Sequence, residues 1–305
     1  MTNDVYVSSA AFRTTSSREM VSMALRYGIT HIELSASLEY SDELLNPIRA
    51  TKDRIRYLVH NYFPTPKTPF VLNLASTDPE QRRMSMDLCE NAIRLSVVLG
   101  APFYSVHAGT ILKLKPEDLN NPNRQVLAGT LPGASYEEAY RILVDSLGTL
   151  NESARQWGIQ LLVENSVVTN AHLRSGNTNT FLLTRAEEFE RLKKDIPDDN
   201  LGFLIDLAHL EITSNALYYN KLFFLERIRS YIYALHLSEN DGQRDTNEAM
   251  TPISWFVPIL KTFPGIPMIV EVNNLPPEQI KQQIDLVQRY RKPGTGVLYS
   301  PDDDL

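Results

Sequence analysis

Short apolar segments alternate with longer segments of helical periodicity along nearly the whole chain. The short segments are rich in Val, Ile, Leu and Phe, as buried strands are, and each precedes a segment with apolar residues three or four positions apart. The pattern predicts strands at residues 4–12, 30–36, 54–62, 102–109, 159–165, 201–210, 231–238 and 267–274. It predicts helices at residues 16–28, 42–50, 79–100, 135–158, 185–195, 221–230, 253–263 and 277–291.

Residues that begin and end helices stand at the expected places. Pro79 near the start and Gly100 just past the end bound the helix at residues 79–100, and Gly28 and Gly158 follow two others. Three predicted helices begin with a capping box, in which Ser or Thr is followed three positions later by Glu. The pairs are Ser16 with Glu19, Ser135 with Glu138, and Thr184 with Glu187.

Strands that alternate with helices of this length favour parallel strands joined by crossover helices. Eight such units without a second zone of composition predict an α/β fold, a (β/α)8 TIM barrel that forms a single domain over residues 1–291. We expect residues 292–305 to be a poorly ordered tail. An open doubly wound sheet is the alternative, but neither GxGxxG nor GxxxxGK(S/T) follows the first strand, as nucleotide-binding versions require.

Composition narrows the classes of partner. The 305 residues are 43% hydrophobic and can bury a large core, while a net charge of -7 disfavours nucleic acid. The single Cys89 cannot form an intramolecular disulfide. Neither a signal-peptide pattern nor an apolar run of roughly 18 residues is present. We therefore expect a cytoplasmic protein with no membrane segment.

Titratable side chains stand where six of the predicted strands end. In several of these strands an apolar residue two positions earlier shares a face with the polar one, which directs the polar side chain into the barrel. Converging carboxylates would raise one another's pKa unless a cation held them, so the pattern predicts a divalent metal centre at the C-terminal mouth of the barrel. The strand-end residues are His60, His107, Glu164, Asp206 with His209 beyond it, His236 and Glu271.

Three other polar residues are less informative. His31 begins a strand, at the end away from the predicted centre, and His172 lies in a polar loop, so a structural or solvated role is expected for both. Glu33 either points into the barrel or pairs locally. Any single His at a strand end is more typical of a hydrogen-bonded core residue than of a ligand, and only the coincidence across six strands indicates metal binding.

Seven segments carry a family resemblance that extends from about Val5 to Arg291. The segments are "VHNYFP", "FVLNLASTDPEQRRMS", "YSVHAG", "LLVEN", "LIDLAH", "ALHLSENDGQRDTNE" and "MIVEVN". Together they resemble the xylose isomerase-like TIM-barrel superfamily, which includes sugar isomerases, sugar epimerases and endonuclease IV.

The resemblance implies a set of metal ligands. In the sugar epimerases of the superfamily, Glu, Asp, His and Glu from the last four strands hold a divalent ion. The matching residues here are Glu164, Asp206, His236 and Glu271. This oxygen-rich set suits Mn2+, Mg2+ or Co2+, whereas added imidazoles shift the preference toward Zn2+.

Endonuclease IV implies further sites. His60 and His107 resemble the residues that hold another zinc ion together with the Glu that matches Glu164, so a second ion is expected here. A third zinc in that enzyme corresponds to His209, Asp245 and Asn247. Because Asn247 replaces a His ligand, phosphodiester chemistry with three ions is disfavoured.

The resemblance implies a metal-dependent isomerase or epimerase of a sugar or sugar derivative. One of Glu164 and Glu271 would remove a proton next to the carbonyl and the other would return it, through an enediolate-like intermediate. We expect a small-molecule sugar to contact His209, Arg244, Asp245 and Asn247.

Several alternatives remain open. Arg244 could instead form a surface ion pair with Asp241 or Asp245. An endonuclease IV-like phosphodiesterase acting on abasic-site DNA, a dehydratase or lyase of the same superfamily, and a non-catalytic metal-binding barrel are the other functions. The long connections at residues 111–134 and 166–182 could form a lid, or the interfaces of a homo-oligomer.

Overall fold

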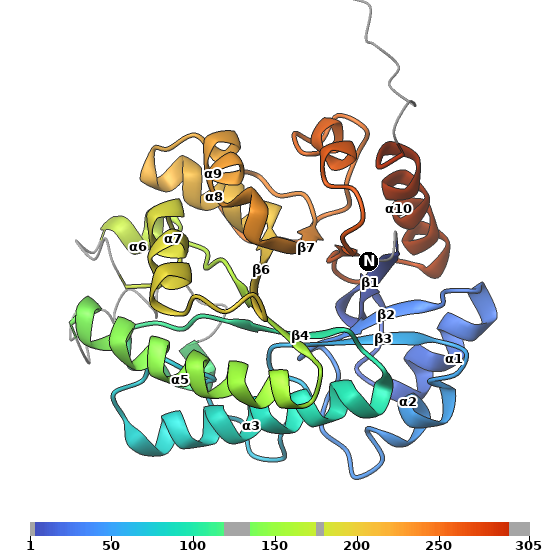
Figure 1. Ribbon diagram of the computed structural model, residues 1–305. Helices are drawn as coiled ribbons and strands as arrows, with labels where there is room; N and C mark the ends of the chain where they lie inside the picture. Colours follow the sequence, from blue (N-terminus) through green and yellow to red (C-terminus); the bar gives the residue numbers. More distant parts are fainter. Residues whose placement is uncertain (1–3, 119–134, 175–179, 293–305) are drawn as a thin grey trace, which may run out of the picture.

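The computed structural model describes residues 4–118, 135–174 and 180–292 of the chain. Eight parallel strands form a closed barrel in chain order, which confirms the predicted TIM barrel (Figure 1). The barrel closes where β8 pairs with β1, with Tyr6 opposite Ile269. The strands are β1 Val5–Ser8, β2 His31–Leu34, β3 Arg56–His60, β4 Phe103–His107, β5 Gln160–Glu164, β6 Leu201–Asp206, β7 Ile232–Leu237 and β8 Met268–Val270.

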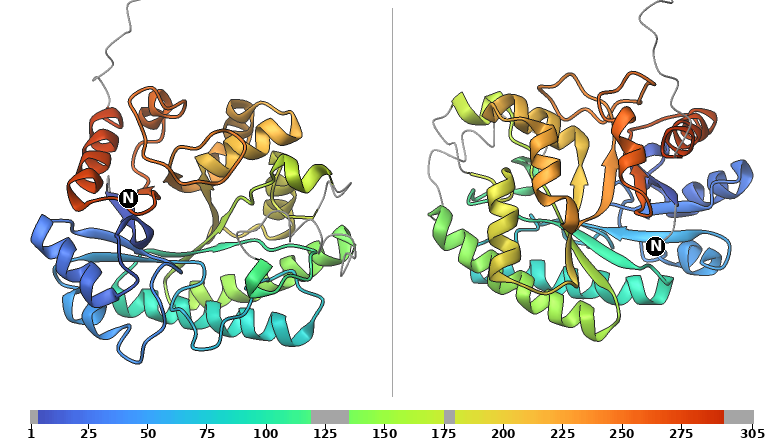
Figure 2. Two further views of the ribbon diagram at one scale, coloured as in Figure 1. Left: turned by 180° about the vertical axis from the view of Figure 1, so that it is seen from behind. Right: turned by 45° about the horizontal axis from the view of Figure 1, so that its top comes forward.

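Helices surround the strands on the outside (Figure 2). The two longest, α3 and α5, lie side by side along one flank of the barrel (Figure 1). The α-helices are α1 Ser17–Tyr27, α2 Asn46–Thr51, α3 Pro79–Leu99, α5 Tyr136–Gln156, α6 Asn170–Arg174, α7 Ala186–Asp195, α8 Leu207–Leu217, α9 Lys221–Ile228 and α10 Pro277–Tyr290. The 3-10 helices are η1 Ser9–Ala11, η2 Pro116–Asp118, η3 Arg229–Tyr231 and η4 Val257–Thr262.

The structure corrects several predicted elements, among them the strand predicted at residues 4–12, which ends at Ser8 and is followed by the 3-10 helix η1. The strand predicted at residues 201–210 ends at Asp206, and α8 begins at Leu207, because the apolar run continues from the buried strand into a largely buried helix. The helix predicted at residues 253–263 is the short 3-10 helix η4. Pro258 lies in its first turn and Pro264 follows it, and a proline restricts the residue before it, which shortens the segment.

The capping box of α7 is shifted by one residue from the predicted pair. The helix has Arg185 at its N-cap, so Glu188, not Glu187, occupies the third helical position. One carboxylate oxygen of Glu188 accepts the backbone N–H groups of Thr184 at 2.7 Å and Arg185 at 2.8 Å. The predicted caps at Ser16 and Ser135 are confirmed, since each accepts the N–H of the Glu three positions later.

The inside of the barrel is filled by an apolar layer that is separate from the core between strands and helices. Its members come from every strand except β2, with Ala101 just before β4, and are each 5% exposed or less. Because side chains alternate along a strand, residues two positions further on also point inward, about 7 Å closer to the C-terminal mouth. The layer consists of Tyr6, Leu58, Ala101, Phe103, Leu162, Leu204, Ala234 and Ile269.

The barrel wall is tightest at Gly202 in β6. A Cβ on Gly202 would lie 2.3 Å from Cδ2 of Tyr233 and 3.0 Å from Cδ2 of Leu162. The pairing between β6 and β7 shifts register beside this position, between Phe203 and Leu204. A glycine therefore lets the neighbouring side chains close against the backbone.

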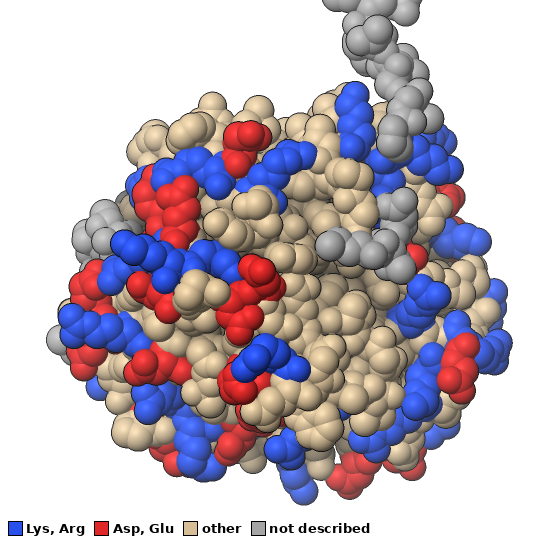
Figure 3. All heavy atoms as spheres, in the orientation of Figure 1, with Lys and Arg blue, Asp and Glu red and all other residues tan. Residues whose placement is uncertain are grey.

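The outer surface of one face carries both signs of charge. Figure 3 shows basic and acidic side chains next to one another over the helices at its left, in place of a separate basic field. Ion pairs there join helices: Arg191 of α7 contacts Glu137 of α5, and Arg227 of α9 contacts Glu190 of α7. Among the described residues, no helix combines the length and the apolar character that crossing a membrane requires.

We predict that Gly202→Ala lowers the free energy of unfolding by about 1–3 kcal/mol, the usual cost of overpacking. Gly148→Ala in α5 is the matched control, because its Cβ would meet nothing within 4 Å. This control should raise the stability by about 0.5–1 kcal/mol, as Ala does in helix interiors. Urea unfolding of both variants measures the difference, and equal changes would contradict the assigned packing.

Candidate active site

The titratable strand-end residues form a polar layer directly above the apolar layer of the barrel. The sequence step is the same in five strands, since each polar residue follows an inward apolar residue by two positions. The pairs are Leu58 with His60, Leu162 with Glu164, Leu204 with Asp206, Ala234 with His236, and Ile269 with Glu271. The alternation of the strands thus brings together side chains up to 211 positions apart (60 and 271).

Glu164 lies at the centre of this layer, with its side chain 1% exposed. Its Oε2 is 3.4 Å from Nε2 of His60 and 3.2 Å from Nε2 of His107. Its Oε1 is 3.6 Å from Nδ1 of His236 and 3.3 Å from Nδ1 of His209. The two oxygens of one carboxylate therefore face two different groups of imidazoles.

The first group of potential ligands comes from the last four strands. Glu164, Asp206, His236 and Glu271 each offer one donor atom, and these atoms all lie within 4.8 Å of one another. Nδ1 of His236 is 2.7 Å from Oε2 of Glu271 and 3.9 Å from Oδ2 of Asp206. Three carboxylates and one imidazole thus converge on a single position.

The second group consists of His60, His107 and Glu164, whose donor atoms also lie within 4.8 Å of one another. Nδ1 of His60 is 2.9 Å from the hydroxyl of Ser105, so Nε2 is the nitrogen turned toward Glu164. The side chain of His107 is 37% exposed, which makes it the most open member of this group. Glu164 belongs to both groups and could bridge two ions.

A divalent cation fits this donor set because several of its atoms are buried without hydrogen-bond partners. Within the described residues, four such atoms belong to the cluster and form no hydrogen bond: both carboxylate oxygens of Glu164, Oδ2 of Asp206 and Nδ1 of His236. Buried polar atoms are normally paired, and an unpaired one costs about 1–3 kcal/mol. Their convergence indicates ionic ligands, since cations held by the two groups would satisfy these atoms.

Burial shifts the pKa values of the clustered side chains when no metal ion is bound. Burial raises the pKa of Asp206 to about 7, and the neighbouring charges of Glu271 and Glu164 act in the same direction. Burial lowers the pKa of His60 well below its usual value and also lowers that of His107. These shifts favour neutral imidazoles at His60 and His107, the form that binds metal.

The other two imidazoles of the cluster, His209 and His236, are shifted in the opposite direction. Burial lowers their pKa as well, but the carboxylates of Asp206 and Glu271 outweigh it and hold the pKa of His209 and His236 well above the usual value. The imidazoles in turn hold the pKa of Glu164 well below its usual value, against the effect of burial.

Asn165 holds Asp206 and His209 in place, and sequence reasoning did not single it out. Its side chain accepts the N–H of Asp206 at 2.7 Å and donates to the carbonyl of Asp206 at 3.0 Å. Its backbone carbonyl is 3.1 Å from Nδ1 of His209. The adjacency of Asn165 to Glu164, directly after a strand end, is the signal that could have identified it.

His209 lies on the first turn of α8 and not on the strand where the sequence pattern placed it. Asp206 is the N-cap of α8, and its Oδ1 accepts the backbone N–H of His209 at 2.8 Å. Nε2 of His209 is 3.3 Å from Oδ2 of Asp245. The helix start thus brings His209 next to the strand-end cluster. The second oxygen of Asp206, Oδ2, still faces that cluster.

The loop after β7 carries the remaining predicted residues. Asp245 reaches His209, whereas Oδ1 of Asn247 accepts a hydrogen bond from Ser238 at 3.2 Å. Arg244 is 75% exposed, and its guanidinium is 2.7 Å from Asp241. The structure therefore brings Asp245 to the cluster and turns Arg244 toward a surface carboxylate.

The structure also shows where Glu33, His31 and His172 lie, the three polar residues that the sequence did not assign to the metal centre. Glu33 points into the barrel, is buried, and has Oε1 3.1 Å from Nε2 of His236. His31 lies at the N-terminal end of β2, as predicted, 3.7 Å from Asp4. His172 is on the short helix α6 and is buried, which corrects the prediction of a polar loop, and its Nδ1 accepts the N–H of Thr169.

A cavity of ≈ 360 Å³ opens onto the cluster at His107, His209 and Asp245. This volume lies within the range of small-molecule sites. The rest of its wall is largely apolar and comes from the connections after β3, β4 and β5. These residues include Tyr62, Phe70, Val71, Leu72, Leu114 and Phe181.

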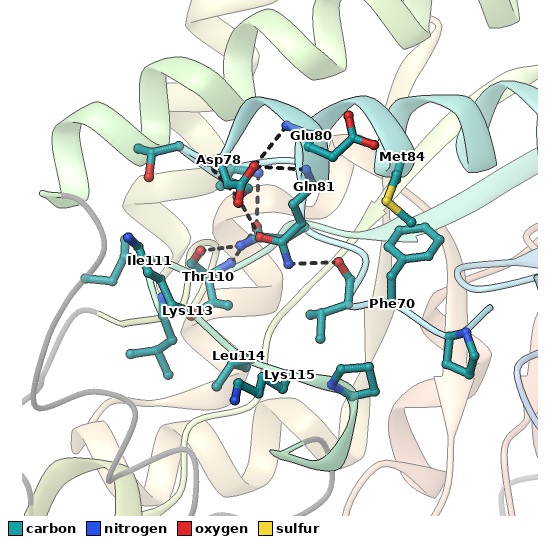
Figure 4. A pocket seen from close by; sticks show the side chains of 18 residues that line it. Phe70, Asp78, Glu80, Gln81, Met84, Thr110, Ile111, Lys113, Leu114 and Lys115 are labelled. Atoms are coloured by element: carbon teal, nitrogen blue, oxygen red, sulfur yellow. Dashed lines mark hydrogen bonds between the residues drawn. The ribbon is translucent and has the colours of Figure 1, made fainter.

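A second cavity of ≈ 450 Å³ lies beyond Phe70 and Leu114, at the start of α3 (Figure 4). None of its described lining residues is a strand-end residue of the cluster. Its polar groups bond to one another: Gln81 donates to the carbonyl of Val71 and accepts from Ser76, while Asp78 caps α3. The chemistry therefore belongs to the cavity at the barrel mouth.

The predicted lid lies partly outside the described residues. Of the connections at residues 111–134 and 166–182, the structure describes residues 111–118, 166–174 and 180–182. The described parts touch each other, since the N–H of Ile111 donates to the carbonyl of Thr180 at 2.9 Å. All but the first residue of the tail at residues 292–305 also lies outside the described residues.

Comparison with known proteins establishes the family. The family model described as "Xylose isomerase-like TIM barrel" matches residues 21–290, which is most of the chain. The chain therefore belongs to the xylose isomerase-like TIM-barrel family, as the resemblance implied. No curated protein sequence matches it.

Solved structures share the fold at low sequence identity. The D-tagatose 3-epimerase-like protein has a TM-score of 0.69 and 20% identity, covering 94% of this chain and 96% of that chain. The 3-keto-D-glucoside 4-epimerase YcjR from E. coli, in its apo form, has a TM-score of 0.64 and 13% identity, covering 94% and 98%. The TTHB071 protein from Thermus thermophilus, soaked with ZnCl2, has a TM-score of 0.59 and 20% identity, covering 93% and 97%.

The shared position of Glu164 predicts how substitutions alter metal binding. Glu164→Gln should weaken binding of both ions by more than about 100-fold, because losing a ligand costs more than losing an outer partner. His107→Ala should weaken only the second ion, since His107 is absent from the four-residue group. Titration of the metal-free variants with Mn2+, Co2+ and Zn2+ measures both affinities. Unchanged binding in Glu164→Gln would contradict the assigned centre.

Proposed function

We propose that the protein is a divalent-metal-dependent isomerase or epimerase of a sugar or sugar derivative. The observation that carries the proposal is the placement of Glu164 and Glu271, whose oxygens lie 3.6 Å and 2.7 Å from Nδ1 of His236 in a cluster that opens to a cavity. The names of the D-tagatose 3-epimerase-like protein and of the 3-keto-D-glucoside 4-epimerase support a sugar as the substrate class.

The two glutamates would transfer the proton. One carboxylate removes the proton from the carbon next to the substrate carbonyl, and the other returns it. The side chain of Glu271 is 15% exposed and that of Glu164 is 1% exposed. Glu271 is therefore better placed to exchange its proton with solvent, a property that isotope labelling can detect.

Glu164, Asp206, His236 and Glu271 would hold the catalytic ion, and His60 and His107 would hold a second ion together with Glu164. The first set suits Mn2+, Mg2+ or Co2+, and the second, with its two imidazoles, suits Zn2+. A divalent ion bound here would supply a Lewis acid that polarises the substrate carbonyl. The largely apolar wall of the cavity would exclude water from the site.

Four polar residues would bind the substrate around this centre. His209 and Asp245 line the cavity, and their side chains contact each other at 3.3 Å. His209 would donate a hydrogen bond to a substrate oxygen, and Asp245 would accept one from a hydroxyl. Asn247 and Arg244 lie on the same loop and would bind the more distant hydroxyls.

The endonuclease IV-like function is the second candidate, because His60, His107 and the His209–Asp245 pair all surround Glu164. Asn247 counts against it, because its carbonyl oxygen is engaged by Ser238 and it offers no imidazole. Cleavage of abasic-site DNA that a chelator stops would favour this candidate. A dehydratase would remove the same proton next to the carbonyl and then release a neighbouring hydroxyl group as water.

Deuterium exchange tests the proposed reaction directly. The metal-loaded protein, incubated in D2O with a panel of ketoses and keto-glycosides, should place deuterium on one carbon of the accepted sugar. Glu271→Gln should reduce this exchange by more than about 100-fold, within the contribution of a proton-transfer group. The control Glu226→Gln changes an exposed carboxylate of α9 and should exchange at the wild-type rate. Wild-type exchange in Glu271→Gln would refute the assigned role.

Substitution of Arg244 tests its proposed contact with substrate. Exposed ion pairs contribute little to stability, so Arg244→Ala should fold as the wild type does. We expect its KM to rise about tenfold with kcat little changed, as loss of a binding contact predicts. An unchanged KM would mean that Arg244 pairs with Asp241 and does not contact the substrate.

A further inference from the structure

We propose that Glu33 is a positioning residue that presents Nδ1 of His236 to the metal centre. The inference rests on the proposed metal site, and it assigns a role to a residue outside the four proposed ligands. Glu33 lies on β2, whereas those ligands come from β5, β6, β7 and the residue after β8. Its side chain crosses the barrel interior to reach β7.

The burial of Glu33 requires a partner. Its side chain is 0% exposed, and a buried carboxylate without a partner costs several kcal/mol. Its Oε1 is 3.1 Å from Nε2 of His236, whose side chain is also 0% exposed. In register with Leu58 of β3, Glu33 is held at the level of the apolar layer and cannot turn outward to water.

This contact determines which nitrogen of His236 is free. A carboxylate accepts and cannot donate when ionised, so Nε2 of His236 carries the hydrogen of the bond. Nδ1 is then the nitrogen left to bind a cation once it gives up its own hydrogen, and it faces Glu271, Glu164 and Asp206. Metal-bound histidines are commonly oriented in this way by a carboxylate on the other nitrogen.

Two other imidazoles of the cluster use Nδ1 to contact neutral groups. Nδ1 of His60 is 2.9 Å from the hydroxyl of Ser105, and Nδ1 of His209 is 3.1 Å from the carbonyl of Asn165. Nε2 of His209 contacts the carboxylate of Asp245 at 3.3 Å, but the side chain of Asp245 is 33% exposed whereas that of Glu33 is fully buried. The negative charge of Glu33 makes His236 a more basic ligand and adds to the attraction for a cation.

A different arrangement would give Glu33 another role. Glu33, His60 and His236 also offer donor atoms within 4.8 Å of one another, and Oε2 of Glu33 has no hydrogen-bond partner within the described residues. If Glu33 bound an ion directly, His236 would have to use Nε2 as a ligand and could not keep its hydrogen there. The protonation of Nε2 therefore distinguishes the two arrangements.

Metal affinity and nitrogen NMR of the Zn2+-loaded protein test the proposal. Glu33→Ala should weaken the first ion by about 10–100-fold, as loss of an outer carboxylate does. Glu33→Gln keeps an acceptor for the N–H and should stay within about fivefold of wild type, by the same reasoning. Ser105→Ala is the matched control, and it should weaken only the second ion because it frees His60.

The NMR readout needs no substrate. In 15N-histidine-labelled protein, assigned with His236→Gln, the Nε2 hydrogen of His236 should appear as a slowly exchanging signal that moves in Glu33→Gln. Absence of a hydrogen on Nε2, an unmoved signal, or wild-type affinity in Glu33→Ala would overturn the role of Glu33. Failure of the wild type to bind any ion would instead overturn the proposed function.

Discussion

The burial of carboxylates whose oxygens form no hydrogen bonds is the constraint on which the rest of the site depends. Glu164 has both oxygens in this state within the described residues, at 1% side-chain exposure, and faces imidazoles at 3.2 to 3.6 Å in the centre of a ring of strands. Hydrophobic packing would not place a charge there, since burial disfavours the ionised form. Such an arrangement is stable only when a cation or bound protons balance the negative charges. The raised pKa of Asp206 shows that this carboxylate gives up its proton with difficulty when no cation is present.

The barrel accounts for the gathering of these groups, because one rule operates on five of the six strands that contribute to the cluster, β4 being the exception. An inward apolar side chain fills the lower layer, and two positions later an inward polar side chain faces the mouth. The apolar layer beneath separates the charges from the opposite end of the barrel and lowers the dielectric around them. The same layer strengthens each interaction with a cation, since less water screens it.

The strand-end residues could be predicted from the sequence because period-two alternation is local and the barrel repeats it. The geometry of His209 could not, because the apolar run through residue 210 does not reveal where β6 becomes α8. The proposed role of Glu33 could not be predicted from the sequence either, since its partner His236 is 203 positions away. Arg244 shows a third limit: the loop conformation that turns it toward Asp241 depends on backbone hydrogen bonds to Asp241, which residue spacing does not specify.

Asp206 connects the helix start to the chemistry, and this connection explains why the site tolerates little rearrangement. One of its oxygens caps α8 by accepting the N–H of His209, and the other faces the cluster. Asn165 holds the backbone of Asp206 on both sides and contacts His209 as well. Since Asn165 directly follows Glu164, a shift of β5 relative to β6 would move a proposed ligand, a helix cap and a proposed substrate contact together. Hydrogen bonds from the side chain of Asn165 to the backbone of Asp206 therefore tie the two neighbouring strand ends together, and a bound cation would meet donors already held in place.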